Sequence, residues 1–455
     1  MTDGLPMPRR MLAIAAISSS NIAMMIDSSI VNVALPTIAR ELNVPDAHMV
    51  MIVTGYQIVL LMGLFPLSSL GDRLGARRMF LIAQCIFCVG CFVSFFASNL
   101  WMLLAVRCLQ ALGAAMALAV STGILREIYP SDQLGRGLGL NTLLITIALV
   151  AAPALGGFLL AFASWRWLFL SELPIVLIAL LMSRSLPTMP PQDRPFNIGS
   201  AVLCVMASGL FGSGLSLLAK SGVHLPSVAV TIAGVAFCVV LFMRESRQAN
   251  PVVPVDLLGS KFIGLSAIAA TFCYAATLVM TVSLPFYLHN DLHFSAFAIG
   301  TTMMGWPIGM MITAPLGGFM SDRHDPALLG MAGIMAAMVT LSLFLMLPDH
   351  PDMLAIAWRF AACGMAFGFF FAPNARLIIG TAPRARAAAA GGVIATVRLT
   401  GQMIGSCIVA LLLSAGAGAV IGPFGTAMIL TLCAAVFVGW RFMIRDTRAA
   451  PTFGV

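Results

Sequence analysis

The first residue that could do chemistry is Asp27, a carboxylate inside an otherwise apolar segment that runs from Met11 to Leu35. At about 1.5 Å of rise per residue, a helix over this segment is long enough to cross a bilayer, and Asp27 then lies about 12 Å below its second end. A charge in the hydrocarbon region is costly, and carboxylates kept there are typically functional. Asp27 is therefore a functional-site hypothesis.

Two more charged side chains, Arg107 and Glu172, fall inside apolar spans. Arg107 lies about 10 Å from one end of its helix, which places it at a depth similar to that of Asp27. The two form either a structural ion pair or a proton site in which Asp27 titrates, because arginine keeps its charge. Glu172 is either an interfacial acid that reaches water or a second carboxylate that shares the proton or attracts a cationic substrate.

The composition is that of an integral membrane protein. Of 455 residues, 60% are hydrophobic and 9% charged, and the mean hydropathy is +1.00; soluble domains carry about 25% charged residues. Long apolar runs, rather than alternating ten-residue segments, predict helices and not a β-barrel. The net charge of +8 does not indicate nucleic-acid binding, because the arginines lie in short loops between apolar runs.

Fourteen apolar spans predict an all-α polytopic membrane protein with both termini on one side. The spans cover residues 11–36, 49–70, 79–97, 100–125, 137–162, 167–183, 197–219, 225–243, 262–288, 296–320, 327–347, 353–373, 387–413 and 424–443. Of the 25 basic residues, 19 fall on the side of the termini, and three (Arg40, Arg166 and Lys220) fall on the other. The positive-inside rule therefore predicts a protein of the inner (cytoplasmic) membrane with cytoplasmic termini.

The chain also repeats itself. Gly55-Tyr56 and then Gly71-Asp72-Arg73 in the second span are echoed by Gly305-Trp306 and Ser321-Asp322-Arg323 in the tenth. Arg107 and Gly113 in the fourth span are echoed by Arg359 and Gly364 in the twelfth. We therefore predict two six-helix bundles, residues 1–184 and 262–455, with two additional helices in residues 185–261. Two such halves with a substrate site between them are typical of transporters.

Four segments resemble the major facilitator superfamily, and specifically its fourteen-helix drug:proton antiporter branch (QacA/EmrB-like). They are DSSIVNVALP at 27–36, GDRLGARR at 71–78, RCLQALG at 107–113, and APALGG at 152–157 followed by WRWLFL at 165–170. The resemblance implies the major facilitator fold, a substrate cavity between the halves, and proton coupling through Asp27, Arg107 and Glu172. Glu172 itself departs from the branch, which often has Asn there.

The resemblance also implies two conformational elements. A latch that holds the outward-open state would comprise Asp72, Arg73, Gly75, Arg77, Asp322 and Arg323. Without the resemblance, its charges would simply mark topology. An antiporter motif would comprise Pro153, Gly156 and Gly157, which bend the fifth span and allow close packing. A kink that fits the helix to lipid is the alternative.

Candidate cavity residues include polar, aromatic and basic side chains. They are Asn32, Tyr56, Gln57, Gln110, Tyr274, Trp306, Asn374, Arg359 and Arg398. Aromatic rings could bind a flat lipophilic cation, although packing or contact with lipid is the favoured role for any single ring. Arg359 and Arg398 have no evident carboxylate on neighbouring spans, so the sequence does not exclude anionic or zwitterionic substrates.

The favoured function is proton-driven export of lipophilic, cationic drugs or toxic compounds by alternating access. Export of a metabolite or organic anion is the alternative, and a non-transporting sensor or scaffold is disfavoured because the loops are short.

No catalytic triad or nucleotide-binding loop is present, so we predict no enzyme and no cofactor besides the proton. Cys85, Cys88 and Cys91 have metal-like spacing, but packing explains three thiols on one apolar face. Expected partners are a small lipophilic substrate, protons and lipid, without nucleic acid; the oligomeric state, a monomer included, stays open.

Overall fold

The computed structural model describes residues 5–130, 134–188, 197–248, 253–348, 350–383, 386–415 and 422–444, and every regular element in these ranges is a helix. The side chains of residues 72, 134–136, 138–139 and 387–388 lie outside the described part of the chain. Fourteen of the described helical segments are long and apolar enough to cross a membrane. The prediction of an all-helical, fourteen-span protein is therefore confirmed.

The helices follow the predicted spans, with breaks in two of them. The elements before residue 200 are α1 (Arg9–Glu41), α2 (Asp46–Met49), α3 (Met51–Leu74), α4 (Ala76–Ser94), α5 (Leu100–Ile128), α6 (Leu134–Phe162), α7 (Arg166–Met182), a 3-10 turn (Ser183–Ser185) and α8 (Ile198–Ser221). The later elements are α9 (Leu225–Glu245), α10 (Val255–Leu258), α11 (Lys261–Asn290), α12 (Ala296–Met303), α13 (Gly305–Arg323), α14 (Pro326–Leu345), α15 (Met353–Thr381), α16 (Ala387–Ala415) and α17 (Pro423–Met443).

The two spans that are broken occupy matching places in the sequence repeat. The second span divides at Val50 into α2 and α3, and the tenth divides at Met304 into α12 and α13. A few residues after each break, Tyr56 and Trp306 are both buried. Tyr56 lies six residues after Val50 and Trp306 two residues after Met304, so both echoed pairs lie in the first two turns of the longer helix.

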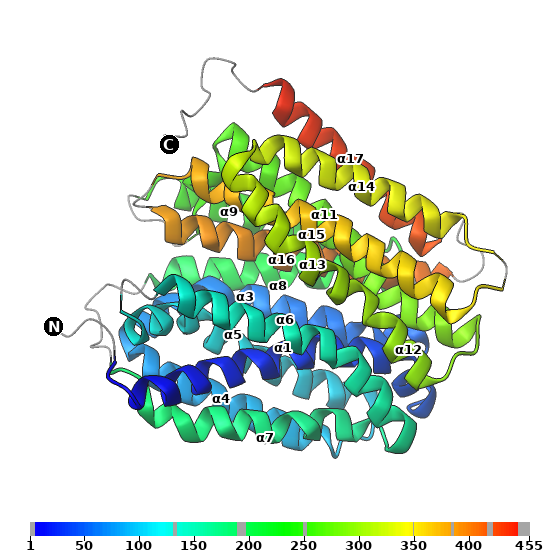
Figure 1. Ribbon diagram of the computed structural model, residues 1–455, viewed down its shortest axis with the longest axis horizontal. Coiled ribbons are helices and arrows are strands. Elements are labelled where there is room, and N and C mark those ends of the chain that lie inside the picture. The colour runs from blue at the N-terminus through cyan, green and yellow to red at the C-terminus, as the bar shows by residue number, and fades with distance from the viewer. Residues whose placement is uncertain are drawn as a thin grey trace.

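Figure 1 shows the two halves as bundles that lie one above the other. Helices α1 and α3–α7 belong to the first half, and α11–α17 belong to the second. Helix α8 packs against α9 and contacts α3 of the first half and α16 of the second. The halves also meet directly, because α1 contacts α11, and α6 contacts α12 and α13.

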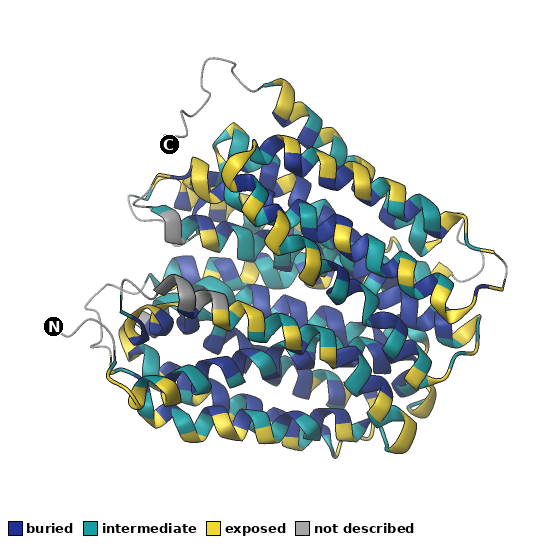
Figure 2. Cartoon of the chain, viewed as in Figure 1, coloured by how far each residue is buried: buried dark blue, intermediate teal, exposed yellow. Residues whose placement is uncertain are grey.

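Burial follows the position of each helix in the bundle. Helix α1 is buried around much of its circumference, whereas α9 presents most of its apolar side chains outward. Figure 2 shows exposed residues on the outward faces of the peripheral helices and buried ones between the bundles. Large apolar side chains such as Phe162, Leu181 and Val239 are exposed on that outer surface. Such a surface suits lipid, since helices satisfy their own backbone hydrogen bonds.

Candidate functional site

A cluster of polar side chains lies buried among the helices of the first half. It is formed by Asp27 of α1, Tyr56 of α3, Cys91 of α4, Arg107 and Gln110 of α5, and Glu172 of α7, and we call it the acid cluster. Its carboxyl groups and its guanidinium are at most 2% exposed. Helices from five separate spans therefore converge on these few charges.

Arg107 is the centre of the acid cluster. Its Nη1 forms an ion pair with Oδ1 of Asp27 and donates a hydrogen bond of 3.0 Å to Oε1 of Gln110. The guanidinium also lies over the ring of Tyr56, 4.4 Å from the ring centre, and 5.7 Å from that of Phe169. The sequence-based pairing of Asp27 with Arg107 therefore has a direct geometric counterpart.

Glu172 belongs to the same cluster and does not reach water. Its side chain is 0% exposed, so the interpretation of Glu172 as an interfacial acid is wrong. The Cys91 thiol donates to Oε2 of Glu172 over 3.7 Å and accepts from Nε2 of Gln110 over 3.5 Å. The carboxyl group also interacts with Asp27 and Arg107. Glu172 thus extends the ion pair into a connected network.

The charges of the acid cluster do not balance unless one proton is bound. Two carboxyl groups, Asp27 and Glu172, lie close enough to interact with each other and face one guanidinium; among the described residues, no donor has hydrogen-bonding geometry to Oδ2 of Asp27 or to Oε1 of Glu172. A buried net charge is strongly unfavourable, and so is a buried acceptor without a donor. One proton held by the two carboxyl groups removes both penalties. The geometry is therefore suited to binding and releasing a proton.

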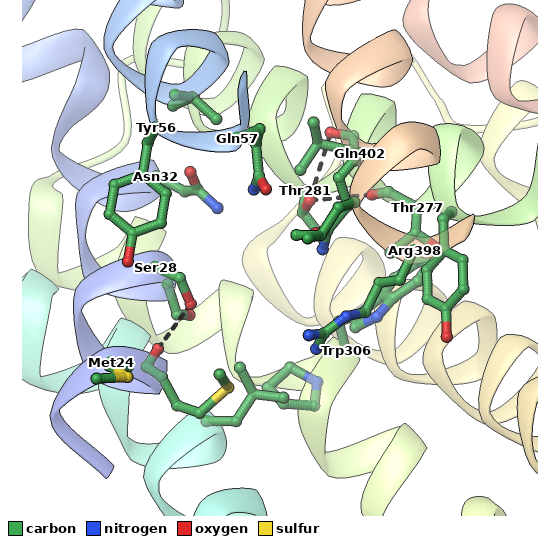
Figure 3. A pocket seen from close by; sticks show the side chains of 18 of the residues that line it. Met24, Ser28, Asn32, Tyr56, Gln57, Thr277, Thr281, Trp306, Arg398 and Gln402 are labelled. Atoms are coloured by element: carbon green, nitrogen blue, oxygen red, sulfur yellow. Dashed lines mark hydrogen bonds between the residues drawn. The ribbon is translucent and has the colours of Figure 1, made fainter. Parts of the chain in front are cut away.

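A cavity of about 320 Å³ lies between the two halves. Six of the predicted cavity residues line it: Asn32, Tyr56, Gln57, Tyr274, Trp306 and Arg398. In Figure 3, Asn32, Tyr56 and Gln57 lie on one side of this space and Trp306, Arg398 and Gln402 on the other. Tyr56 belongs to both the cavity wall and the acid cluster, so it connects the two.

Three predicted cavity residues lie elsewhere. Gln110 points into the acid cluster, where it bonds Arg107 and Cys91. Asn374 is buried in the second half and accepts a hydrogen bond of 2.9 Å from Arg441. Arg359 donates to the backbone oxygen of Leu343 in the last turn of α14 and to that of Ala355 in the first turn of its own helix α15. These three residues therefore do not line the cavity between the halves, although Asn374 lines a smaller pocket that shares Tyr274 and Phe371 with it.

Other site residues were not predicted. Cys91 was interpreted as packing, yet its thiol bridges Gln110 and Glu172. Gln402 and Thr277 line the cavity; Gln402 follows Arg398 by four residues, which places both on one helix face. Arg441, one of the 19 basic residues that the sequence assigns to the side of the termini, is 1% exposed and donates a hydrogen bond to Ser266. Among the described residues, no three potential metal ligands converge.

The latch residues lie at the face that holds the ends of the described chain, which we call the terminal face. Gly75 joins α3 to α4 with φ of +89°, a conformation that favours glycine, so the predicted tight bend is present. Asp322 forms an ion pair with Arg376 of α15, and Arg323 lies 4.6 Å from the ring centre of Phe319. Arg73 is exposed and Arg77 is partly exposed. The side chain of Asp72 lies outside the described part of the chain.

The antiporter-motif residues lie toward the opposite face, which we call the far face. A Cβ atom on Gly157 would lie 2.7 Å from the oxygen of Ala296 in α12, and one on Gly300 would lie 2.4 Å from the oxygen of Pro153 in α6. Gly156 approaches Ile30 of α1. Asn290 also donates to Asp46 over 2.7 Å across the two halves. The halves are therefore in tight contact at the far face.

The comparisons with known proteins decide the family. The profile of the Major Facilitator Superfamily matches residues 17–406 and 265–453. The chain belongs to this superfamily. The chain is 35% identical to the uncharacterized transporter YebQ of Escherichia coli (strain K12), with 98% of this chain and 99% of YebQ covered. It is therefore a multi-pass membrane transporter of the superfamily and not an enzyme.

More distant relatives differ in what their names say they transport. The riboflavin transporter RibZ of Clostridioides difficile (strain 630) is 27% identical, with 82% of this chain and 81% of RibZ covered. A multidrug resistance protein B homolog of Mycobacterium tuberculosis (strain ATCC 25618 / H37Rv) is 27% identical, with coverages of 86% and 73%. A solved POT family transporter in complex with a thioalcohol conjugated peptide shares the fold, with a TM-score of 0.72, 13% identity and 95% of each chain covered.

Proposed function

We propose that this transporter is a proton-driven antiporter of the fourteen-helix branch that exports small lipophilic compounds. The observation that carries the proposal is the contact between Arg107 of the acid cluster and Tyr56 of the cavity wall. An ionisable cluster that must gain or lose a proton is thereby placed one side chain away from the substrate cavity. A substrate that moves Tyr56 changes the surroundings of Arg107 and so the stability of the Asp27–Arg107 pair.

In alternating access, the change at the Asp27–Arg107 pair would be coupled to a movement of the two halves. The far face is closed by the approach of α6 to α12 and by the hydrogen bond between Asn290 and Asp46. We propose that a proton enters from the far face when these contacts open, binds at Asp27 and Glu172, and leaves at the terminal face. Substrate moves the opposite way, because the single cavity serves both faces in turn.

The direction of transport follows from the proposed orientation. Nineteen of the 25 basic residues lie on the side of the termini, which favours a cytoplasmic terminal face in the inner membrane. Export is supported by the sequence resemblance to drug antiporters and by the multidrug resistance homolog among the relatives. The riboflavin transporter among the relatives indicates that a flat aromatic metabolite is also a reasonable cargo.

The charge of the substrate separates the favoured function from its alternative. The expected cationic substrate would need an acid on the cavity wall, and among the described lining residues Arg398 is the one charged side chain. Asp27 and Glu172 lie behind Tyr56 rather than on the wall. Arg398 therefore supports the second candidate function, the export of an organic anion or metabolite, over a lipophilic cation.

Asp27→Asn tests proton coupling. Asparagine keeps the shape and an oxygen acceptor for Arg107 but cannot bind and release a proton. In inverted vesicles with an imposed acid interior, we expect the wild type to accumulate at least one of ethidium, riboflavin and 2-naphthoate, and the variant to accumulate none. Wild-type accumulation by the variant would show that Asp27 does not carry the coupling proton.

Two controls make the result interpretable. The variant should elute as wild type in size-exclusion chromatography, which shows that it is folded and inserted. It should also still exchange labelled compound across the membrane when compound is present on both sides without a pH gradient. If the wild type accumulates none of the three compounds, the proposed export of flat lipophilic molecules is contradicted.

A further inference from the structure

We propose that the substrate is a planar aromatic anion whose acidic group binds Arg398. This inference rests on the proposed function and specifies the substrate class of the same cavity. Arg398 lies on α16, and Figure 3 shows its guanidinium reaching from the second half toward the space between the two groups of labelled side chains. The guanidinium of Arg398 is therefore placed to bind an acidic group of a substrate in the cavity.

The charge of Arg398 is unmatched by any acid in the described part of the chain. Other arginines within the transmembrane helices have partners: Arg107 pairs with Asp27, Arg359 donates to two backbone oxygens, and Arg441 donates to Ser266 and Asn374. For Arg398, no ion pair or hydrogen bond is found among the described residues. A cation inside the membrane is costly without a partner. A bound carboxylate would supply that partner, with charge-assisted and bidentate hydrogen bonds.

The walls around Arg398 specify a flat, aromatic body. Tyr274 and Phe371 are stacked, with ring centres 4.1 Å apart and planes at 12°, and both line the cavity. Trp306 lines it as well and is fixed by Phe360 and Phe367 at 5.2 and 5.3 Å. Rings held by neighbouring rings present rigid faces, on which an aromatic ligand stacks with little loss of side-chain entropy.

Polar groups opposite Arg398 fit substituents on that ring. The amide of Gln57 lines the cavity from α3. Gln57 is buried, with only 7% of its surface exposed, and its Oε1 has no hydrogen-bond partner among the described residues. A buried acceptor without a donor is unfavourable, and a hydroxyl or amino group of the ligand would satisfy it. The favoured substrate is therefore an aromatic carboxylate with a hydrogen-bond donor at its other end.

The test compares ligands that share one ring system and differ in charge. Purified wild-type protein is titrated by calorimetry with 6-hydroxy-2-naphthoate, the corresponding neutral amide, and the corresponding methylammonium cation. No pH gradient is present, so the measurement is independent of proton coupling. We expect the carboxylate to bind at least about tenfold more tightly than the amide, because the amide lacks the charge-assisted hydrogen bonds to Arg398. We expect the cation not to bind.

Substitutions then assign the charge preference to Arg398. Arg398→Gln should weaken carboxylate binding by about tenfold and leave the amide unaffected, and Arg398→Lys should fall between. Arg359→Gln removes an intramembrane arginine outside the cavity and should leave both affinities unchanged. Melting temperatures of all variants show that each is folded.

Three outcomes would overturn the proposal: no binding of the carboxylate, equal or tighter binding of the amide or the cation, or an Arg398→Gln variant with wild-type carboxylate affinity. These outcomes differ from failure of the proposed function. If the carboxylate binds through Arg398 but Asp27→Asn still drives accumulation, the substrate class stands and the coupling mechanism is wrong.

Discussion

At the scale of single residues, the acid cluster combines a predictable part with an unpredictable one. Asp27 and Arg107 could be paired from the sequence, because each is costly inside a span and their depths match. The burial of Glu172 could not be predicted, because depth along a helix does not tell which face points inward. Its contact with Cys91, 3.7 Å away, depends on how α4 and α7 pack.

Glu172→Gln tests whether the second carboxyl group matters for coupling. Glutamine supplies a neutral group of the same shape, so the Asp27–Arg107 pair is balanced without a bound proton. We expect accumulation driven by a pH gradient to fall about tenfold, a loss of about 1.4 kcal/mol of coupling free energy. Exchange of substrate without a gradient should stay close to wild type.

Glu245 provides the matched control for this experiment. It is also 0% exposed, but it lies in α9 and accepts from the backbone of Val253. Glu245→Gln should therefore retain gradient-driven accumulation. If Glu172→Gln behaves in the same way, Glu172 is a structural member of the cluster and Asp27 alone binds the proton.

At the scale of helices, the sequence predicted the number of spans and their repeat but not their contacts. The breaks at Val50 and Met304 could not be predicted, because both residues lie inside the apolar spans. The glycines of the antiporter motif predicted a close approach, and the structure supplies the partner, α12 of the other half. Arg359 and Arg107 occupy equivalent sequence positions, yet Arg359 bonds helix ends while Arg107 is buried.

Gly300→Ala tests the closure between α6 and α12. The added Cβ would lie 2.4 Å from the oxygen of Pro153, and such overpacking costs about 1–3 kcal/mol. The closed far face should become less populated by about tenfold or more. Hydrogen–deuterium exchange in residues 153–162 and 296–303 should rise, and transport should slow.

The control for this change is another glycine in a transmembrane helix. Gly380→Ala adds a Cβ that meets nothing within 4 Å, so exchange and transport should match the wild type. Unchanged exchange in Gly300→Ala would mean that the helices do not need this approach to close the far face.

At the scale of the whole molecule, the two halves have different roles around one cavity. The first half contributes the acid cluster behind Tyr56, and the second contributes stacked rings and Arg398. The repeat could be found in the sequence, but this division of roles could not, since it depends on which side chains turn toward the cavity. Because residues of both halves line the cavity, the proposed alternating access predicts that the halves move relative to each other during transport.

A cross-link at the far face tests that movement. Asn290 of the second half donates to Asp46 of the first over 2.7 Å, so cysteines at both positions are close enough for a short bis-methanethiosulfonate reagent. Cross-linking Asp46→Cys/Asn290→Cys should hold the far face closed and reduce transport at least about tenfold, and reduction of the link should restore it.

A second pair on the same face separates movement between halves from damage by the reagent. Arg166 donates to the backbone oxygen of Ala97 over 3.2 Å, and both residues belong to the first half. Cross-linking Ala97→Cys/Arg166→Cys should leave transport unchanged, because a half that moves as a rigid body does not strain a link within it. The native cysteines react equally in both variants. Full transport by the cross-linked Asp46–Asn290 pair would show that the far face need not open there, and rigid-body rocking of the halves would be the wrong mechanism.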